Sequence, residues 1–449
     1  MELTAAGVRA AARSAFDDFR PEFEALIRTA SVSAAGFDPK HVRSSAEQTA
    51  AALTRADLVD VDLLEVRGAH PAVFGRAPGP AGSRTVLLYA HHDVQPAGAE
   101  EVWDSPPFEP AERSGRLYGR GTADNKSGIA THLAALRAWE GRPPVGVAVL
   151  IEGEEEIGSP HLAEFLTRYG ELLRADVIVF ADCSSWGSGQ PALTCSLRGI
   201  LDCSVEVRTL DHAVHSGKYG GLAPDALTTL CRLLATLHHR DGTVAVRGLR
   251  SCRRRWPKLD ESATRHAAGV RPGVQLLGGG PLGRRLWGEP AICVLRIDTG
   301  PEAEFAHKLV PAARAEISLR LAPGDETEHA FRAIEDHLHR HAPWGAEVTV
   351  AVTRAGQPFR VSTSGPAYEA FRRACVETWG RPPVEPGSGG SLPLVAELAR
   401  QYPDAALLLT GAEDPDSKAH AENESVHLDE LRNCCVNEAL LLGHLGSMA

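Results

Sequence analysis

The feature that most constrains the fold is a set of short, continuous apolar runs separated by helical segments. The runs Thr85–Ala90, Val145–Ile151 and Asp176–Phe180 have the length of strands but lack the in-out alternation of a half-exposed strand. Between them, Ser127–Trp139 and Pro160–Tyr169 have helical character. Strands that are apolar on both faces and alternate with helices predict a largely parallel sheet covered by helices on both sides.

The middle of the chain has a different pattern. Its strand-length segments alternate between apolar and polar residues, which is typical of strands that expose one face. With the helical stretches between them, they predict an antiparallel α+β unit. The first pattern returns from about Pro366. The alternating segments are Leu201–Arg208, Ala313–Leu321 and Ala346–Val352.

A chain of 449 residues is longer than the roughly 100–200 residues of a usual domain. The two patterns predict a discontinuous α/β domain formed by residues 1–197 and 358–449. An α+β domain is expected as an insertion at residues 198–357. The predicted fold class is therefore α/β, with an inserted antiparallel domain.

Composition narrows the partners and the compartment. The formal net charge of -11 argues against nucleic acid or an anionic membrane surface as the main partner. No segment approaches the ~20 continuous apolar residues of a membrane helix, and the first residues lack the features of a secretory signal. The 9 cysteines are scattered, without a Cys-x-x-Cys pair. We expect a reduced, cytoplasmic protein without a membrane partner.

The 19 histidines are the first indication of chemistry, although most of them are expected to be ordinary surface residues. Polar helical stretches are the usual place for such surface positions. Histidines in stretches of this kind are His238, His239, His337, His339 and His341.

Histidine and acidic residues follow the predicted buried strands. Ligands of open parallel sheets bind beyond the carboxyl ends of the strands, so these side chains are expected at one edge of the sheet. Several buried acids at one edge are costly unless cations neutralise them. Imidazole and carboxylate without thiolate are typical of catalytic zinc, with manganese or cobalt as substitutes. The residues are His91, Asp93, the acidic run Glu152–Glu156, Asp182, His420, and Asp124 in a glycine-punctuated loop.

A series of motifs along nearly the whole chain carries a family resemblance. They are Tyr89–Pro96, Leu117–Gly121 with Asp124–Lys126, Glu152–Ser159, Asp182, His215–Gly217, Ser318–Pro323, Gly389–Pro393 and His420–Glu424. The sequence resembles the dinuclear zinc amidohydrolases, which include carnosinase-type dipeptidases, aminoacylase, acetylornithine deacetylase, succinyl-diaminopimelate desuccinylase and glutamate carboxypeptidase. It is most similar to the dipeptidase branch.

The resemblance implies a centre with two zinc ions per subunit, for which manganese or cobalt are possible substitutes. His91 and Asp182 would hold one ion, and Glu156 and His420 the other. Asp124 would bridge the two ions, as two-metal sites require. In this family the peptide bond that follows the bridging aspartate is often cis.

The resemblance also assigns the acid–base chemistry. Glu155 would be the general base that takes a proton from a metal-bridging water and passes it to the leaving amine. Asp93 would accept the ring N–H of His91 and fix its tautomer. The position of Gly158 in the motif places Glu155, within the acidic run, in the role of the base.

The inserted domain, by the same resemblance, would complete the substrate site and form a homodimer. His215 would stabilise the oxyanion in the active site of the partner subunit. Arg320 would bind the substrate carboxylate as a planar fork. Gly390 and Ser391, in a glycine-rich turn before a helix, would form an anion site. His307 stands near a position where the dipeptidase branch often has a substrate-binding asparagine, which leaves the preferred side chain open.

The predicted activity is hydrolysis of a dipeptide or short peptide at the amide bond next to a free carboxylate. One alternative is an N-acyl-amino-acid deacylase with the same metals and an acylated amino acid as substrate. A second alternative is a non-catalytic protein that keeps the fold. The complete set of ligand positions and the presence of Glu155 favour an enzyme.

Overall fold

The computed structural model describes residues 4–299, 307–390 and 392–448, and the chain divides into two compact units. The first unit comprises Met1–Cys195, Val361–Pro386 and Leu392–Ala449. The second comprises Ser196–Arg360 and Gly387–Ser391. The second unit is therefore formed by one long and one short insertion into the sequence of the first unit.

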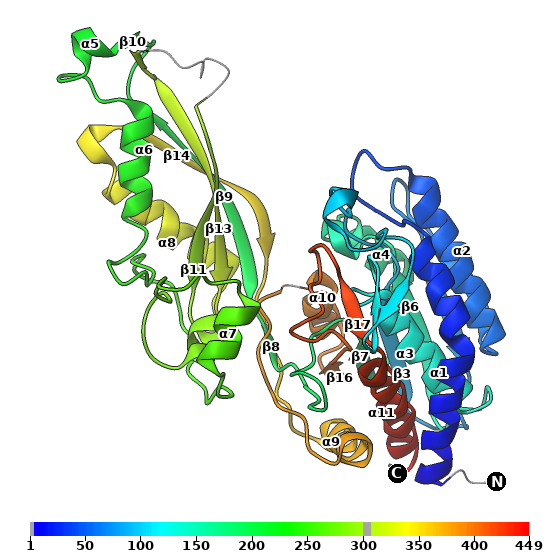
Figure 1. Ribbon diagram of the computed structural model, residues 1–449. Coiled ribbons are helices and arrows are strands. Elements are labelled where there is room, and N and C mark those ends of the chain that lie inside the picture. Colours follow the sequence, from blue (N-terminus) through cyan, green and yellow to red (C-terminus); the bar gives the residue numbers. More distant parts are fainter. Residues whose placement is uncertain (1–3, 300–306, 391, 449) are drawn as a thin grey trace. The chain divides into compact units, whose positions relative to one another are not determined.

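The first unit contains a six-stranded sheet in the order β1-β2-β6-β3-β7-β16 (Figure 1). β6, β3, β7 and β16 run parallel, whereas β1 and β2 pair antiparallel at one edge. The largely parallel sheet predicted from the apolar runs is thus confirmed. The strands are β1 (Val59–Leu64), β2 (Ala72–Ala77), β3 (Thr85–His91), β6 (Gly146–Glu152), β7 (Val177–Phe180) and β16 (Ala406–Leu409).

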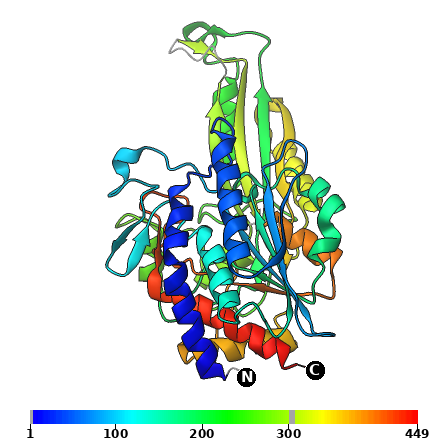
Figure 2. The same ribbon diagram turned by 90° about the vertical axis from the view of Figure 1, so that its right-hand side faces the viewer.

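Helices cover both faces of this sheet, because its inner strands are apolar on both sides. Val86 and Leu88 of β3 belong to a core shared with α1, α3, α9 and α11, and Figure 2 shows α1 and α2 on the viewer's side of the unit. Leu150 of β6 faces the other way and lines a small cavity with Leu162 of α4 and Leu394 of α10. The helices are α1 (Ala5–Arg28), α2 (Pro39–Arg55), α3 (Lys126–Arg137), α4 (Leu162–Tyr169), α9 (Pro366–Trp379), α10 (Pro393–Gln401) and α11 (Leu428–Gly446).

Strands β1 and β2 form an edge that the sequence patterns do not predict. β1 is largely exposed and has a register shift between Val59 and Asp62, so it lacks both an apolar run and a regular alternation. β2 is almost wholly buried and pairs with β6. Gly75 of β2 passes so close to Leu58 that a Cβ at this glycine would lie 3.1 Å from the leucine side chain. The lack of a side chain at Gly75 therefore allows β2 to pack closely against the Leu58 side chain.

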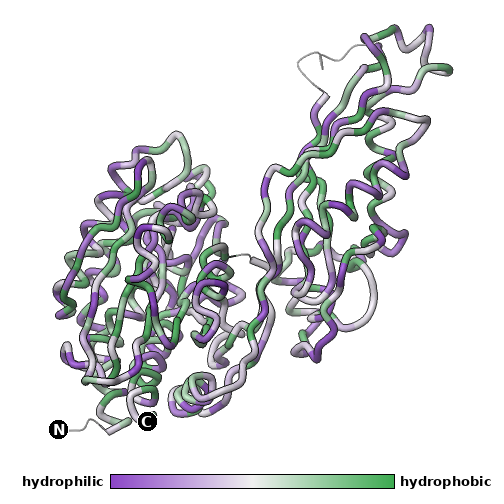
Figure 3. The backbone as a smooth tube through the Cα atoms, turned by 180° about the vertical axis from the view of Figure 1, so that it is seen from behind, coloured by the Kyte–Doolittle hydropathy of each residue, from purple (hydrophilic) through white to green (hydrophobic). Residues whose placement is uncertain are grey.

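The second unit contains a four-stranded antiparallel sheet in the order β11-β13-β9-β14, with α6 and α8 against one face. Ile317 and Leu319 of β13 are buried toward these helices, whereas Arg314 on the same strand is exposed. The mixed colours of these strands in Figure 3 reflect this alternation, and the predicted antiparallel α+β fold is confirmed. The elements are β9 (Gly199–Arg208), α6 (Ala226–Ala235), β11 (Ala291–Asp298), β13 (Ala312–Leu321), α8 (Thr327–Arg340) and β14 (Glu347–Gly356).

Shorter elements complete the two units. A three-stranded sheet in the first unit has the order β17-β5-β4, and two small antiparallel pairs in the second unit join β10 to β12 and β8 to β15. Within the described residues, every helix is either too short or too polar to span a lipid bilayer. The short elements are β4 (Ala111–Arg113), β5 (Arg116–Tyr118), β8 (Ser196–Leu197), β10 (Val214–His215), α5 (Ser216–Tyr219), α7 (Glu261–Ala267), β12 (Lys308–Leu309), β15 (Phe359–Arg360) and β17 (Ser425–His427).

His337 is a correction to the expectation of a surface histidine, because it is 3% exposed. It lies on the face of α8 that also buries Ile334 and Leu338. Its Nε2 atom lies 3.1 Å from the carbonyl oxygen of Thr236 at the end of α6. Helical spacing places residue 337 on the apolar stripe of α8, so its polar neighbours along the sequence were misleading.

The buried pair His132–Glu438 predicts a pH-dependent contribution to stability. His132 Nδ1 lies 2.8 Å from Glu438 Oε1. Burial lowers the pKa of His132, but the Glu438 charge and hydrogen bond outweigh it and leave the pKa above its usual value. A histidine pKa that is raised in the folded state adds stability below the unfolded value of about 6.5, and this contribution disappears as the pH rises through the folded pKa.

We expect Glu438→Gln to lower the free energy of unfolding by about 1.5–3 kcal/mol at pH 6 and by less at pH 9. Urea denaturation with EDTA present at each pH measures the difference. Glu430 is the matched control, because it is also buried but accepts from Gly189 N at 2.7 Å and Trp379 Nε1 at 2.9 Å, which do not titrate in this range. A cost of Glu438→Gln that stays constant with pH would contradict the prediction.

Candidate metal centre

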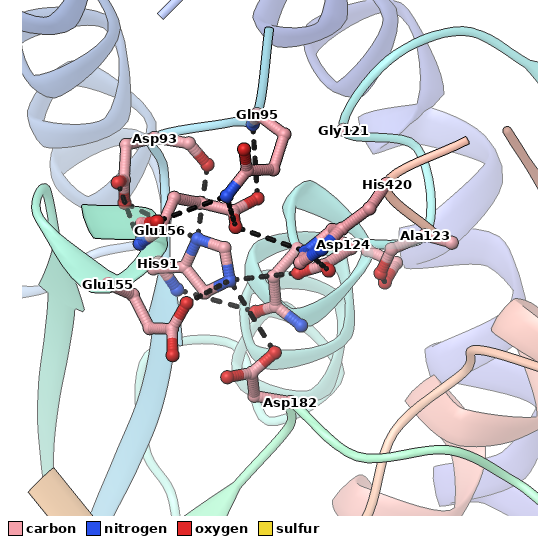
Figure 4. Close-up of polar contacts among 12 residues, drawn as sticks. His91, Asp93, Gln95, Gly121, Ala123, Asp124, Glu155, Glu156, Asp182 and His420 are labelled. Atoms are coloured by element: carbon pink, nitrogen blue, oxygen red, sulfur yellow. Dashed lines mark hydrogen bonds and ion pairs between the residues drawn. The ribbon is translucent and has the colours of Figure 1, made fainter. Parts of the chain in front are cut away.

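The candidate site forms where three neighbouring parallel strands end. β3 ends on His91, whose Cα pairs with that of Glu152 at the end of β6, and Asp182 follows β7 by two residues. Glu155 and Glu156 lie in a short 3-10 turn just beyond β6. Adjacent parallel strands in register deliver their carboxyl ends to one edge, which brings these side chains together (Figure 4).

One group of potential ligands surrounds His91. Its Nε2 atom lies 3.0 Å from Asp124 Oδ1 and 3.5 Å from Asp182 Oδ1. One ligand atom from each of these three residues lies within 4.8 Å of the others. The His91 side chain is fully buried, so its orientation is set by the surrounding protein.

A second group forms around His420. Its Nε2 atom lies 2.9 Å from Asp124 Oδ2 and 3.1 Å from Glu156 Oε2. Asp124 therefore directs one oxygen toward each histidine, and Figure 4 shows it between them. The peptide bond between Asp124 and Asn125 is cis, as the family resemblance implies. A carboxylate shared in this way is the arrangement of a bridging ligand.

The chemistry of this donor set fits divalent cations. Within the part of the chain that the structure describes, Asp182 Oδ2 is buried and has no hydrogen-bond partner. Burial and then the Asp124 charge raise the pKa of Glu156 to about 7, and burial also raises the pKa of Asp182. Crowded carboxylates of this kind are costly without nearby positive charge. Two imidazoles and three carboxylates would hold zinc, manganese or cobalt.

The two histidines are strongly perturbed by the same acids. Burial lowers the pKa of His91, but the Asp182 charge and the hydrogen bond with Asp124 outweigh this and place it well above its ordinary value. Hydrogen bonds with Asp124 and Glu156 raise the pKa of His420 to about 11. Only the neutral ring is a metal ligand, so a cation would compete with a proton at each imidazole.

Asp93 contacts the residues of the site without belonging to either ligand group. Its Oδ2 accepts hydrogen bonds from Ser33 Oγ at 2.7 Å and from the Glu156 backbone N–H at 3.1 Å. The nearest acceptor to His91 Nδ1 is the backbone oxygen of Asp93 at 3.0 Å, while the Asp93 carboxylate lies 3.4 Å away. The residue thus faces His91, but its backbone is closer to the ring than its carboxylate.

Glu155 faces the ligand groups, and Glu154 does not. Glu155 Oε2 lies 4.0 Å from His91 Nε2, and burial followed by the Asp182 charge raises the pKa of Glu155 well above its ordinary value. Glu154 instead lies 2.9 Å from His161 Nδ1 and accepts from the His70 backbone N–H at 2.9 Å. This orientation distinguishes the two neighbours in the acidic run.

The remaining predicted site residues belong to the second unit. His215 is exposed, and its Nδ1 accepts from Gly217 N at 3.0 Å. The carbonyl of His307 accepts from Ser216 N at 2.9 Å, because β10 and β12 pair there. His215 and His307 are therefore brought close to each other.

Arg320 and the glycine-rich turn also lie in the second unit. Arg320 is half-buried on β13, and its carbonyl accepts from Arg198 Nη2 at 3.2 Å. Gly390 is exposed, and its N–H donates to Ser388 Oγ at 3.1 Å. The prediction for Ser391 lies outside the described residues.

Some residues around the centre were not singled out from the sequence. Gln95 Nε2 donates to Glu156 Oε2 at 2.9 Å, and the Gln95 backbone N–H donates to Oε1 at 3.1 Å. Ser33 contacts Asp93, as described above. Burial, followed by the Asp124 charge, raises the pKa of Glu413 to about 8. Gln95 lies within a recognised motif, whereas Ser33 and Glu413 reach the site only through folding.

The fold and this cluster together define the class of metal-dependent hydrolases. Residues 87–442 match the profile of peptidase family M20/M25/M40, and the chain belongs to this family. The predicted resemblance is therefore confirmed, and the chain is a metal-dependent peptidase.

Relatives support this assignment over most of the chain. The cysteinylglycine-S-conjugate dipeptidase of Corynebacterium striatum is 34% identical over 411 residues, which cover 90% of this chain and 88% of that protein. The Beta-Ala-His dipeptidase of Rattus norvegicus is 26% identical over 362 residues, which cover 76% of this chain and 73% of that protein.

Solved structures show the same fold. The di-peptidase Dug1p of Saccharomyces cerevisiae matches with a TM-score of 0.84 at 19% identity, covering 99% of both chains. Human carnosine dipeptidase 1 matches with a TM-score of 0.83 at 22% identity, again covering 99% of both chains.

Proposed function

We propose that this protein hydrolyses dipeptides or short peptides at the amide bond next to a free C-terminal carboxylate, with two zinc ions per subunit. The observation that carries the proposal is Asp124, whose two oxygens contact His91 and His420 separately, with Glu155 beside the first group. The names of the relatives from Corynebacterium striatum and rat, both dipeptidases, support the choice of substrate.

The chemistry divides between cations and protein groups. Bound cations would polarise the scissile carbonyl and lower the pKa of a water molecule. Glu155 would accept the proton as the water oxygen bonds to the carbonyl carbon, and it would return that proton to the amine when the C–N bond breaks. Burial raises the pKa of Glu155, and a raised pKa favours a group that returns the proton it has accepted.

The second unit would supply substrate recognition. Arg320 would bind the substrate carboxylate together with Gly390 and Ser391, and His307 would affect side-chain preference. His215 of the partner subunit would stabilise the oxyanion in a homodimer formed through the second unit. The exposure of His215 supports this role, and exposed apolar side chains on the edge strand β11, such as Leu295 at 62%, support the interface.

A cytoplasmic location is part of the proposal. Within the described residues the cysteines form no disulfide, and most of them are buried. Free cysteines are typical of a reducing compartment, where disulfides rarely persist. Zinc is the proposed metal, with manganese or cobalt as possible substitutes.

A substrate panel tests the function. We expect metal-loaded protein to release amino acids from unmodified dipeptides and to leave N-acetyl and N-succinyl amino acids largely intact. Treatment with a chelator should abolish this turnover, and zinc, manganese or cobalt should restore it, because the cations activate the water. Free amino acids are quantified by chromatography.

Two outcomes would favour the alternatives. Turnover of the acylated substrates alone would identify a deacylase. A folded chain that binds fewer than two cations and stays inactive with each added metal would identify a non-catalytic protein.

A further inference from the structure

The loop that carries His420 is bonded to β5. This strand leads into the loop of residues 119–125, called the Asp124 loop below. β17 pairs antiparallel with β5, and the loop between β16 and β17 presents His420. Arg116 of β5 donates to both oxygens of Asp414, at 2.8 and 2.9 Å, near the start of this loop. It also donates to Ser425 Oγ at 2.8 Å, at the loop's end. The loop is therefore held at both ends by one strand.

Glu424 makes the closest connection between the two loops. Its fully buried Oε2 accepts from Arg120 Nη1 at 2.6 Å and from Gly121 N at 3.0 Å. Its Oε1 accepts from Ala123 N at 2.9 Å and from Asp124 N at 3.0 Å. A carboxylate that receives successive backbone N–H groups fixes the path of the backbone that donates them.

The backbone conformation of the Asp124 loop depends on these hydrogen bonds. Gly121 has a φ of +82°, and a Cβ there would lie 2.6 Å from Val94 Cγ1, so the loop is tightly confined. Figure 4 shows Ala123 beside Asp124 and His420 at this place. The side chain of Asp124 can direct its two oxygens to two different histidines only if its backbone is held.

We infer that Glu424 is a positioning residue of the metal centre: it holds the backbone of residues 121–124 so that Asp124 is placed to bridge before any cation binds. Glu424 follows His420 by four residues, so its hydrogen bonds to residues 121–124 also link the loop that carries His420 to Asp124. This inference rests on the proposed two-metal function, but it concerns metal binding and not the substrate.

A plain structural ion pair is the competing explanation. Arg120 and Glu424 are both buried, so their pairing alone would stabilise the fold. Glu430 again supplies the control, since it is a buried glutamate that accepts from Gly189 N and Trp379 Nε1. If Glu424 only stabilises the fold, Glu424→Gln and Glu430→Gln should have the same consequences.

Cobalt titration of the full chain distinguishes the two explanations. We expect Glu424→Gln to bind Co²⁺ about 10–100-fold more weakly than the wild type. In the variant, the NH₂ group of the glutamine would face N–H donors that in the wild type donate to a carboxylate oxygen. Binding is followed by the visible spectrum of Co²⁺ and by metal content after dialysis. Glu430→Gln should titrate like the wild type. The inference would be overturned if Glu424→Gln bound Co²⁺ as tightly as the wild type, or if Glu430→Gln weakened Co²⁺ binding by the same factor.

A measurement on the wild type covers the case in which Glu424→Gln does not fold. Hydrogen exchange of the metal-free protein should already show protected amides at Gly121, Ala123 and Asp124, because they donate to Glu424, which belongs to neither ligand group among the described residues. Exchange at the rate of an unstructured peptide, with protection only after Co²⁺ is added, would refute pre-positioning.

The two proposals can fail separately. Wild-type protein that binds two Co²⁺ ions but hydrolyses no dipeptide would contradict the proposed function and leave the role of Glu424 intact. Active wild type with an unchanged Co²⁺ titration in Glu424→Gln would contradict only the positioning role.

Discussion

Replacing Glu155 by glutamine should lower kcat for dipeptide hydrolysis by about 10²–10⁴-fold, the range for loss of a general acid–base group. Glutamine has nearly the same shape but cannot accept a proton from water or return one to the amine. Glu155 is not a member of either ligand group, so both cations should remain bound. Steady-state kinetics and metal analysis of the same preparation measure the two quantities.

Glu154→Gln is the matched control for this experiment. Glu154 is the adjacent residue in the same acidic run, but its carboxylate contacts His161 and the His70 backbone. Its substitution should leave kcat within a few-fold of the wild type. A large loss in Glu154→Gln together with an active Glu155→Gln would show that the base is assigned to the wrong glutamate.

Replacing Asp124 by asparagine should have the largest effect on the metal content. Asp124 is the only residue that belongs to both ligand groups found among the described residues. Asparagine offers one neutral oxygen and cannot bridge two cations, so we expect fewer than about one cation per chain after dialysis, and loss of activity. Inductively coupled plasma mass spectrometry measures the content, and circular dichroism verifies folding.

Asp182→Asn provides the comparison, because Asp182 belongs only to the group around His91. This variant should lose one cation and keep about one at the group around His420. Full retention of two cations by Asp124→Asn would exclude a bridging role. Equal losses in both variants would show that the two groups do not bind independently.

Much of the fold follows from local pattern. The continuous apolar runs of β3, β6 and β7 can be buried only in a sheet covered on both faces, and such runs are typical of parallel strands. β1 and β2 are not predicted, because the register shift between Val59 and Asp62 interrupts the pattern of β1 and Gly75 interrupts the apolar run of β2. His337 is a different case, because helical spacing places it on the apolar stripe of α8 although its neighbours along the sequence are polar.

The sequence by itself determined which residue types stand at the ends of the strands, and hence the metal-type cluster. This was possible because the ends of parallel strands meet whatever the details of packing. The family resemblance predicted a bridging Asp124 and a base at Glu155. Only the tertiary structure decided how the side chains point: Asp124 directs one oxygen to each of two histidines, Glu154 points to His161, and Glu424 accepts from the Asp124 backbone. These orientations depend on loops brought together from distant parts of the chain, and local sequence does not encode that geometry.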